Sequence, residues 1–314
     1  MIYSLEGKRV WVAGHKGMVG SSIVDRLQNE GCEILTISRQ ELDLLDQRSV
    51  REWMKQERPD AIFLAAARVG GIFANANRPA DFIYENLMIE VNVIDAAFRN
   101  NVEKLLFLGS SCIYPRLAKQ PIVEDSLLTG PLEKTNEAYA VAKIAGIKLC
   151  SAYREQHGCD FISAMPTNLY GPRDNFDLTT SHVLPALIRK AHEAKLADAQ
   201  ELNIWGSGTP KREFLHVDDC ADALVFLMRY YSETDHVNVG CGQDIAILDL
   251  ARLVSDVVGF AGGIVTDPSK PDGTPRKLMS IDRISALGWQ PKISLRDGIE
   301  ATYKWYCNRQ AQSV

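Results

Sequence analysis

Short apolar runs alternate with amphipathic stretches through the first half of the chain. The runs are rich in Val, Ile, Leu, Phe and Ala, as expected of strands buried on both faces. They occupy residues 8–13, 33–37, 61–67, 104–109 and 161–165. Between them, apolar residues recur every three or four positions, which predicts helices, the two longest over residues 80–99 and 135–157. The alternation predicts an α/β fold with a doubly wound parallel sheet that binds ligands at the carboxyl ends of its strands.

This regular alternation is lost after Gly171. A polar segment and a predicted helix follow, and then short predicted strands and a cluster of Pro and Gly before a short C-terminal region. The helix covers residues 182–193 and the strands lie near residues 203–206, 214–217 and 237–240. We therefore predict a smaller, discontinuous lobe beside the sheet domain. The sheet domain would consist of residues 1–171 and 214–240, and a substrate-binding lobe of residues 172–213 and 241–314.

A glycine-rich loop follows the first predicted strand and precedes a helix that ends near Gly31. Its glycines permit a tight turn and a close approach of the backbone to a pyrophosphate, and the helix N-terminus offers free N–H groups to that anion. The motif predicts a Rossmann domain that binds a dinucleotide, although a glycine-rich turn without a ligand has the same spacing. The predicted contact residues are Gly14, His15, Lys16, Gly17, Met18, Val19 and Gly20.

The end of the second predicted strand indicates which dinucleotide is bound. NAD sites usually place Asp or Glu there to bind the ribose 2′-hydroxyl, whereas this strand ends in Ser38-Arg39. Arg39 and Lys16 are suited to a 2′-phosphate. We therefore predict NADP(H) as the cofactor, with two solvated surface cations as the alternative reading of these residues.

Composition narrows the class of protein. The net charge of −5 gives no bias toward nucleic acid or anionic membranes, and no apolar run reaches the ~20 residues of a membrane span. The seven cysteines are scattered without a Cys-x-x-Cys pair, and the six histidines lack metal-ligand spacing. We expect a cytoplasmic globular protein with reduced thiols and without a metal, nucleic acid or membrane as partner.

Tyr139 and Lys143 lie one turn apart on a predicted helix and therefore share a face. An ammonium beside a phenol favours the phenolate and lowers a pKa that starts near ~10. A phenol tuned in this way exchanges a proton with a carbonyl oxygen near neutral pH. Tyr-x-x-x-Lys is common on helices, but here a dinucleotide loop precedes it and Ser110 ends a predicted strand between them. That combination favours a catalytic role.

Together these features resemble the extended short-chain dehydrogenase/reductase family. The resemblance rests on Gly14-x-x-Gly17-x-x-Gly20, Ser110, Tyr139-x-x-x-Lys143 and the segment 168–172. It implies that strand ends contact the cofactor in addition to the glycine loop and Arg39. These residues are Leu108, Gly109, Ser110, Ser111, Lys143, Pro166, Thr167, Asn168, Leu169 and His182.

Within this family the chain resembles more closely the enzymes that epimerise GDP-4-keto-6-deoxy-D-mannose at C3 and C5 and then reduce C4 with NADPH. The similarity runs nearly end to end. Its marks are the segments 14–20, 109–115, 181–183, 205–210, 212–219 and 270–277. Lys16 is a departure, because some relatives carry Arg there, and Lys keeps the charge without the bidentate fork.

The resemblance implies a role for each catalytic residue. Ser110 would hydrogen-bond the C4 carbonyl, Tyr139 would protonate its oxygen, and Lys143 would hold the nicotinamide ribose and lower the Tyr139 pKa. Cys112 would remove a proton beside the ketone, and His182 would return one from the opposite side. If the strand stays extended beyond Ser110, Cys112 shares its face, and a nearby imidazolium could favour the thiolate. In isolation, such a cysteine is more often simply buried, and such a histidine more often a surface or capping residue.

A second set of residues is expected to bind the nucleotide sugar. Arg212 and Trp205 are suited to the diphosphate and the base, and Lys190, Asp272 and Lys277 are expected to complete the pocket. Ordinary surface charge is the alternative for this set.

Two other functions remain open. A related nucleotide-sugar 4-epimerase or 4,6-dehydratase would use the same scaffold, but dehydratases typically carry an acidic pair where this chain has Ser111-Cys112. A non-catalytic NADP-sensing protein often lacks the Tyr or Lys that this chain retains.

The predicted helix over residues 80–99 is apolar on more than one side. A helix of this kind needs a second burial partner besides its sheet. We therefore predict a homodimer whose interface pairs this helix with the Tyr139 helix, with burial by the C-terminal lobe as the alternative.

Overall fold

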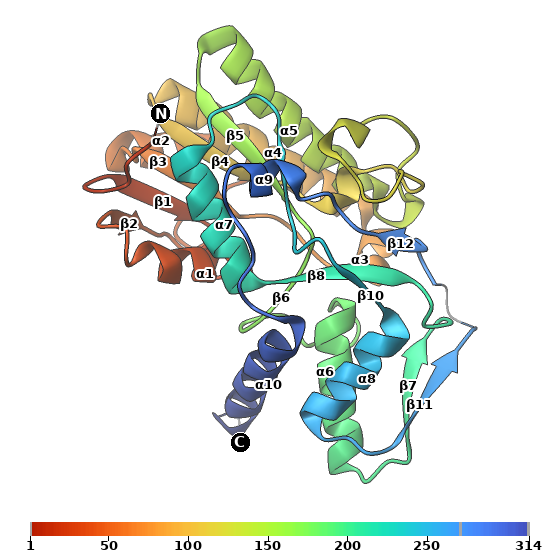
Figure 1. The fold of residues 1–314 in the computed structure, drawn as a ribbon. Helices are drawn as coiled ribbons and strands as arrows, with labels where there is room; N and C mark the ends of the chain where they lie inside the picture. Colours follow the sequence, from red (N-terminus) through yellow and green to blue (C-terminus); the bar gives the residue numbers. More distant parts are fainter. Residues whose placement is uncertain (1, 270–271, 313–314) are drawn as a thin grey trace.

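The computed structural model describes residues 2–269 and 272–312 of the chain, with a six-stranded sheet at the centre of its larger part (Figure 1). The strands are β1 (Arg9–Ala13), β2 (Glu33–Leu35), β3 (Ala61–Leu64), β4 (Lys104–Leu108), β5 (Asp160–Pro166) and β9 (Val237–Val239). All pair in parallel, in the order β2-β1-β3-β4-β5-β9. The predicted doubly wound sheet is confirmed, although the strands expected at 33–37 and 61–67 end earlier.

Helices cover both faces of the sheet because successive side chains of a strand point to opposite faces. Val10 and Val12 share one core with α1 (Met18–Leu27) and α7 (Val217–Tyr230), whereas Trp11 belongs to a core on the opposite face. Three helices pack in that second core (Figure 1). They are α2 (Gln47–Glu57), α4 (Pro79–Arg99) and α5 (Glu137–His157).

A smaller lobe with its own hydrophobic core lies below the sheet in Figure 1. In this lobe and its junction with the sheet domain, β7 pairs with β11, and β8 pairs with β6, β10 and β12. These strands are β6 (Asn168–Tyr170), β7 (Glu201–Trp205), β8 (Lys211–His216), β10 (Asp244–Ala246), β11 (Gly263–Asp267) and β12 (Arg276–Lys277). The helices are α6 (Val183–Leu196), α8 (Ile247–Val258) and α10 (Leu295–Gln312). No helix in the described part of the chain is long and apolar enough to cross a membrane.

The short C-terminal region that follows the Pro- and Gly-rich cluster contains helices that were not predicted. Residues beyond 240 form three strands and the helices α8, α9 (Asp282–Ala286) and α10, and α3 (Ile72–Asn77) was not predicted either. The buried residues of α8 do recur at helical spacing. They are Leu250, Ala251, Val254, Ser255 and Val258. The missed strands are two to five residues long and pair with partners distant in sequence, which local periodicity does not reveal.

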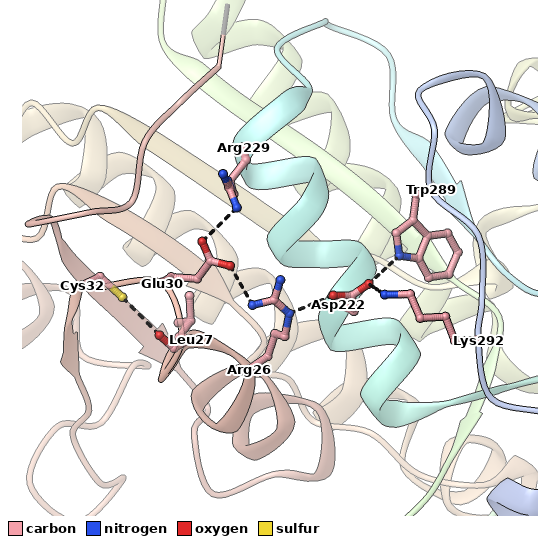
Figure 2. A network of polar contacts seen from close by, with 8 residues as sticks. All are labelled: Arg26, Leu27, Glu30, Cys32, Asp222, Arg229, Trp289 and Lys292. Atoms are coloured by element: carbon pink, nitrogen blue, oxygen red, sulfur yellow. Dashed lines mark hydrogen bonds and ion pairs between the residues drawn. The ribbon is translucent and has the colours of Figure 1, made fainter.

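Part of the C-terminal segment packs on the sheet domain instead of the smaller lobe. Ile284 and Trp289 belong to the core that contains α1 and α7. Figure 2 shows how Asp222 of α7 holds this segment. Its carboxylate accepts hydrogen bonds from Arg26 Nε (2.8 Å) and Trp289 Nε1 (3.0 Å) and pairs with Lys292 Nζ at 3.3 Å. The division of the chain into the two sets of segments given above stays a prediction.

Glu213 is a fully buried acid on β8, where the two parts of the molecule join. Its Oε1 accepts the backbone N–H groups of Cys241 and Gly242, each at 2.7 Å, and its Oε2 accepts that of Met279 at 3.0 Å. One carboxylate thus ties β8 to the segments that follow β9 and β12.

Replacing Glu213 with Ala is expected to lower the free energy of unfolding by about 3–5 kcal/mol. Three N–H groups lose their acceptor at about 1–3 kcal/mol each, and water recovers part of the loss. Urea titration of the variant measures the change. Glu201→Ala, at an exposed position of β7, is the matched control and is expected to change stability by less than about 0.5 kcal/mol. Equal stability of the two variants would contradict the role given to Glu213.

Candidate active site

The loop between β1 and α1 is shaped for close approach of a ligand to the backbone. Gly14 has φ +93°, and a Cβ there would lie 2.7 Å from the Ala66 nitrogen. A Cβ at Gly20 would lie 2.2 Å from the Gly14 carbonyl oxygen. Helix α1 begins after Gly17, and no side chain in the described structure caps it, so its first N–H groups are available to an anion. The loop therefore fits a dinucleotide pyrophosphate held at a helix N-terminus.

Arg39 is exposed in the turn that follows β2. Glu41, which the sequence analysis passed over, lies in the same turn and accepts hydrogen bonds from the Ser38 hydroxyl (2.6 Å) and N–H (3.1 Å). The bonds from Ser38, helped by the charge of Lys16, lower the pKa of Glu41. The Glu41 carboxylate is thus hydrogen-bonded within the turn. Lys16 and Arg39 supply positive charge nearby.

Tyr139 lies near the start of α5, beside the segment that follows β4. Burial raises the pKa of its phenol, the charges of Cys112 and Glu90 raise it further, and a hydrogen bond with Ser110 lowers it. The Phe82 ring packs edge-on against the phenol, with ring centroids 6.3 Å apart. The expected lowering of the Tyr139 pKa is therefore wrong for this structure, because burial and nearby negative charge dominate.

Lys143 is buried between α5, α4 and the end of β4. Its Nζ donates to the Leu108 carbonyl oxygen at 3.0 Å and pairs with Glu90 Oε1 at 3.0 Å. It also lies 5.9 Å from the centroid of the Tyr139 ring. Glu90 was not among the predicted site residues, although an acid between Ile89 and Val91 in an apolar part of the helix is a visible signal in the sequence.

The chain does not stay extended beyond Ser110. Ser110 instead begins a 3₁₀ turn over Ser111–Ile113, and its Oγ accepts the Cys112 N–H at 3.3 Å. The expectation that Ser110 and Cys112 share a strand face is therefore wrong. The turn places the Cys112 sulfur 3.1 Å from Asn136 Nδ2, a contact that sequence analysis missed, and 3.7 Å from Lys277 Nζ. The thiol thus lies beside an amide donor and an ammonium.

His182 lies immediately before α6, and its side chain caps nothing within the described structure. His182 is a solvent-exposed residue, yet burial by the surrounding protein lowers the pKa of its imidazole. Burial therefore disfavours the imidazolium, and its effect on the Cys112 thiolate stays a prediction. Lys277 is the cation found beside the sulfur.

Two of the predicted substrate residues come together at Cys112. Arg212 and Lys277 are paired opposite each other on β8 and β12. Burial lowers the pKa of Arg212, and the charges of Cys112 and Glu133 oppose that change. The thiol is thus bordered by two cations that could also hold a diphosphate.

The other predicted substrate residues come from three elements: Lys190 from α6, Trp205 from the end of β7, and Asp272 from the segment beyond β11. Lys190 Nζ lies 5.4 Å from the centroid of the Trp205 ring, and that ring is 58% exposed. Asp272 accepts the Ser207 N–H at 2.6 Å, so its carboxylate fixes the turn beyond Trp205. The substrate contacts of this group stay a prediction.

The segment after β5 makes contacts within the protein. Thr167 Oγ1 and Asn168 Nδ2 both donate to the Glu213 carbonyl oxygen, at 3.4 and 2.8 Å. Leu169 packs against the core that contains α1 and α7. The cofactor contacts expected from residues 166–169 therefore stay a prediction.

Comparison with known proteins gives concordant results. Residues 10–240 match the NAD dependent epimerase/dehydratase family. The chain is 62% identical over 312 residues to a GDP-L-fucose synthase of Sinorhizobium fredii, and the match covers 99% of each chain. It is similar in structure to a GDP-6-OMe-4-keto-L-xylo-heptose reductase from C. jejuni, with TM-score 0.92, 38% identity and coverage of 98% of this chain and 100% of that one. It is also similar to a GDP-L-fucose synthetase from Naegleria fowleri bound to NADP, with TM-score 0.90, 27% identity and coverage of 99% and 97%.

Proposed function

The chain belongs to the NAD dependent epimerase/dehydratase family, and from this membership we propose that it is a GDP-L-fucose synthase. It is an NADP-dependent oxidoreductase with epimerase activity, which converts GDP-4-keto-6-deoxy-D-mannose to GDP-L-fucose. The resemblance predicted from the sequence is confirmed, and a relative at 62% identity carries this name. The observation that carries the proposal is the place of Ser110 at the carboxyl end of β4, where it hydrogen-bonds the Tyr139 phenol and accepts the backbone N–H of Cys112.

The first half of the reaction is proton exchange beside a ketone. C3 and C5 both flank the C4 carbonyl, so loss of a proton from either carbon gives an enolate stabilised by the carbonyl oxygen. Cys112 takes the proton as a thiolate, next to Lys277 Nζ at 3.7 Å. His182 returns a proton to the opposite face, which inverts the centre. The lowered pKa of His182 makes its protonated form, once present, a ready donor.

The second half is reduction of C4. When bound, NADPH supplies the hydride. Tyr139 gives its proton to the C4 oxygen, and Ser110 hydrogen-bonds that oxygen. Because burial raises the pKa of Tyr139, the phenol keeps its proton at neutral pH and is present as the acid that this step needs. Different side chains around one carbonyl therefore serve the two halves.

A dehydratase on the same scaffold is the less favoured alternative. Dehydratases typically carry an acidic pair after β4, and this chain has the buried Ser111 and the partly buried Cys112 there. Incubating the protein with GDP-4-keto-6-deoxy-D-mannose and NADPH and identifying the sugar by NMR separates the functions. GDP-L-fucose with one NADPH oxidised per sugar is expected. A product that forms without NADPH oxidation would contradict the proposal.

NADPH is expected to be preferred over NADH by tenfold or more in kcat/KM. Lys16 and Arg39 would make charge-assisted contacts to a 2′-phosphate, each worth roughly 1.5–3 kcal/mol. Steady-state kinetics with both cofactors measures the preference, and Arg39→Ala should reduce it. Arg252→Ala, at an exposed ion pair on α8, is the control that should leave it unchanged. Equal kcat/KM for NADPH and NADH in the parent protein would refute the assignment.

The homodimer proposal rests on apolar side chains on the outer side of α4 and α5. Phe82, Val93 and Ile94 of α4 are buried within the subunit, whereas Tyr84 is 60% and Val91 41% exposed. Val141 on the adjacent α5 is also 41% exposed. These side chains would be covered by the same helices of a second copy.

Sedimentation at micromolar concentration is expected to show a species of about twice the 34.9 kDa chain mass. Val91→Glu should shift it toward the monomer, because a charge would be placed in an apolar interface. Val265→Glu, at a 38% exposed position on β11, is the control. A single monomeric species in the parent protein would rule the dimer out.

We also propose a cytoplasmic location. All seven cysteines are free thiols, as a reducing compartment would keep them.

A further inference from the structure

The buried acid that pairs with Lys143 is not used in the reaction described above. Glu90 and Lys143 have side chains only 1% and 2% exposed, and their Oε1 and Nζ atoms are 3.0 Å apart. The Lys143 ammonium also lies over the Phe107 ring, 4.7 Å from its centroid. Three elements, α4, α5 and β4, therefore enclose a single charge pair.

The surrounding structure makes room for this carboxylate. Gly146 lies three residues after Lys143 on α5, and a Cβ there would lie 2.8 Å from Glu90 Oε2 and 2.4 Å from Phe107 Cζ. Any larger residue would displace the acid or the ring. An ammonium buried without a partner is strongly destabilised, so Lys143 needs an anion in this position.

Glu90 acts on Tyr139 as well as on Lys143. The titratable groups that affect the phenol are Cys112 from the segment after β4, Glu90 from α4 and Lys143 from its own helix. Cys150, which also lies near Glu90, stays a neutral thiol because burial raises its pKa to about 12. Burial raises the pKa of Glu90, and the Lys143 ammonium at 3.0 Å opposes that rise and favours the carboxylate. The Lys143 ammonium alone would favour the Tyr139 phenolate, and the Glu90 carboxylate opposes that effect.

We propose that Glu90 is a positioning residue for the reduction. It holds Lys143 Nζ between β4 and Tyr139 and balances the lysine charge, so that the phenol keeps its proton until the substrate oxygen takes it. Of the three N–H donors of the ammonium, one is directed to Leu108 and one to Glu90, which leaves the third for a ligand. This inference rests on the proposed role of Tyr139 as the proton donor.

The test is a pH profile of NADPH-dependent reduction for the parent protein and Glu90→Gln. Without the carboxylate, the lysine charge is unopposed, the Tyr139 pKa falls, and the alkaline limb of kcat moves down by about one pH unit or more. Glu90→Asp moves the carboxylate away from Lys143 by about the length of one methylene group. It should shift the alkaline limb in the same direction by a smaller amount. Asp95→Asn, on the same helix as Glu90, breaks the ion pairs of Asp95 with Arg51 of α2 and Arg99 of α4 and should leave the limb in place.

A second readout needs no substrate. Tyrosinate absorbance is titrated as the difference between each protein and its own Tyr139→Phe version, which cancels the other tyrosines. Ionisation of Tyr139 should begin at lower pH in Glu90→Gln than in the parent. If the parent fails to reduce the nucleotide sugar, the proposed function is refuted. The titration still tests whether Glu90 raises the pKa of Tyr139, because it needs no substrate.

A uniform loss of rate with an unmoved alkaline limb would mean that Glu90 is only structural and would overturn the proposal. If Glu90→Gln does not fold, the same comparison is made with Glu90→Asp. An alkaline limb of Glu90→Asp identical to that of the parent would then contradict the proposal that Glu90 balances the Lys143 charge.

Discussion

Tyr139→Phe is expected to lower the rate of NADPH oxidation by about 10²–10⁴-fold while proton exchange at C3 and C5 continues. The substitution removes the proton donor and keeps the ring that packs against Phe82. Cys112 and the cation Lys277 beside it are untouched. Stopped-flow or steady-state measurement of NADPH absorbance gives the reduction rate, and mass spectrometry in D₂O gives the exchange.

The matched control for this variant is Tyr153→Phe on the same helix. The Tyr153 hydroxyl donates to Asp95 Oδ1 at 2.9 Å and has no part in the proposed site. Its rates are expected to equal those of the parent within about twofold. If Tyr139→Phe retained near-normal NADPH turnover, another group would have to protonate the C4 oxygen.

Cys112→Ser is expected to abolish deuterium uptake at C3 and C5 while slow NADPH oxidation persists. A hydroxyl keeps the approximate size of the thiol but is far less acidic, so the base is lost and the acid of the second half remains. The expected product is a sugar nucleotide that is reduced at C4 and not epimerised. A decrease in exchange of at least about 10²–10⁴-fold corresponds to loss of a positioned base.

Cys159→Ser is the control, because this cysteine lies beyond α5 and packs against the core that contains α2, α4 and α5. Its exchange and reduction rates should match those of the parent. Formation of fully epimerised product by Cys112→Ser at the parent rate would mean that another residue is the base.

The sheet domain could be predicted because its strands are continuous apolar runs. Burial on both faces gives Ala61–Leu64 and Lys104–Leu108 a pattern that few other elements share. The smaller lobe lacks such a signal. Its β11 (Gly263–Asp267) pairs with β7 (Glu201–Trp205) some sixty residues earlier, and only the three-dimensional arrangement shows that partnership.

The electrostatic environment of the site could likewise not be predicted from local sequence. Motifs identified the side chains Ser110, Cys112 and Tyr139, but spacing does not reveal how deeply a group is buried or which charge faces it. The Tyr139 pKa rises where the Tyr-x-x-x-Lys motif alone predicts a fall, because burial and the charges of Cys112 and Glu90, which belong to other elements, raise it. Lys277 likewise reaches Cys112 from β12, 165 residues further along the chain.

The central claim is that one site performs proton exchange beside a ketone and then reduces that ketone. The most direct test is to run the parent protein with GDP-4-keto-6-deoxy-D-mannose and NADPH in D₂O and to locate deuterium in the product by NMR. The expected product is GDP-L-fucose that carries deuterium at C3 and C5 and the protium transferred from NADPH at C4. A C4-reduced product with protium at both C3 and C5 would contradict the claim.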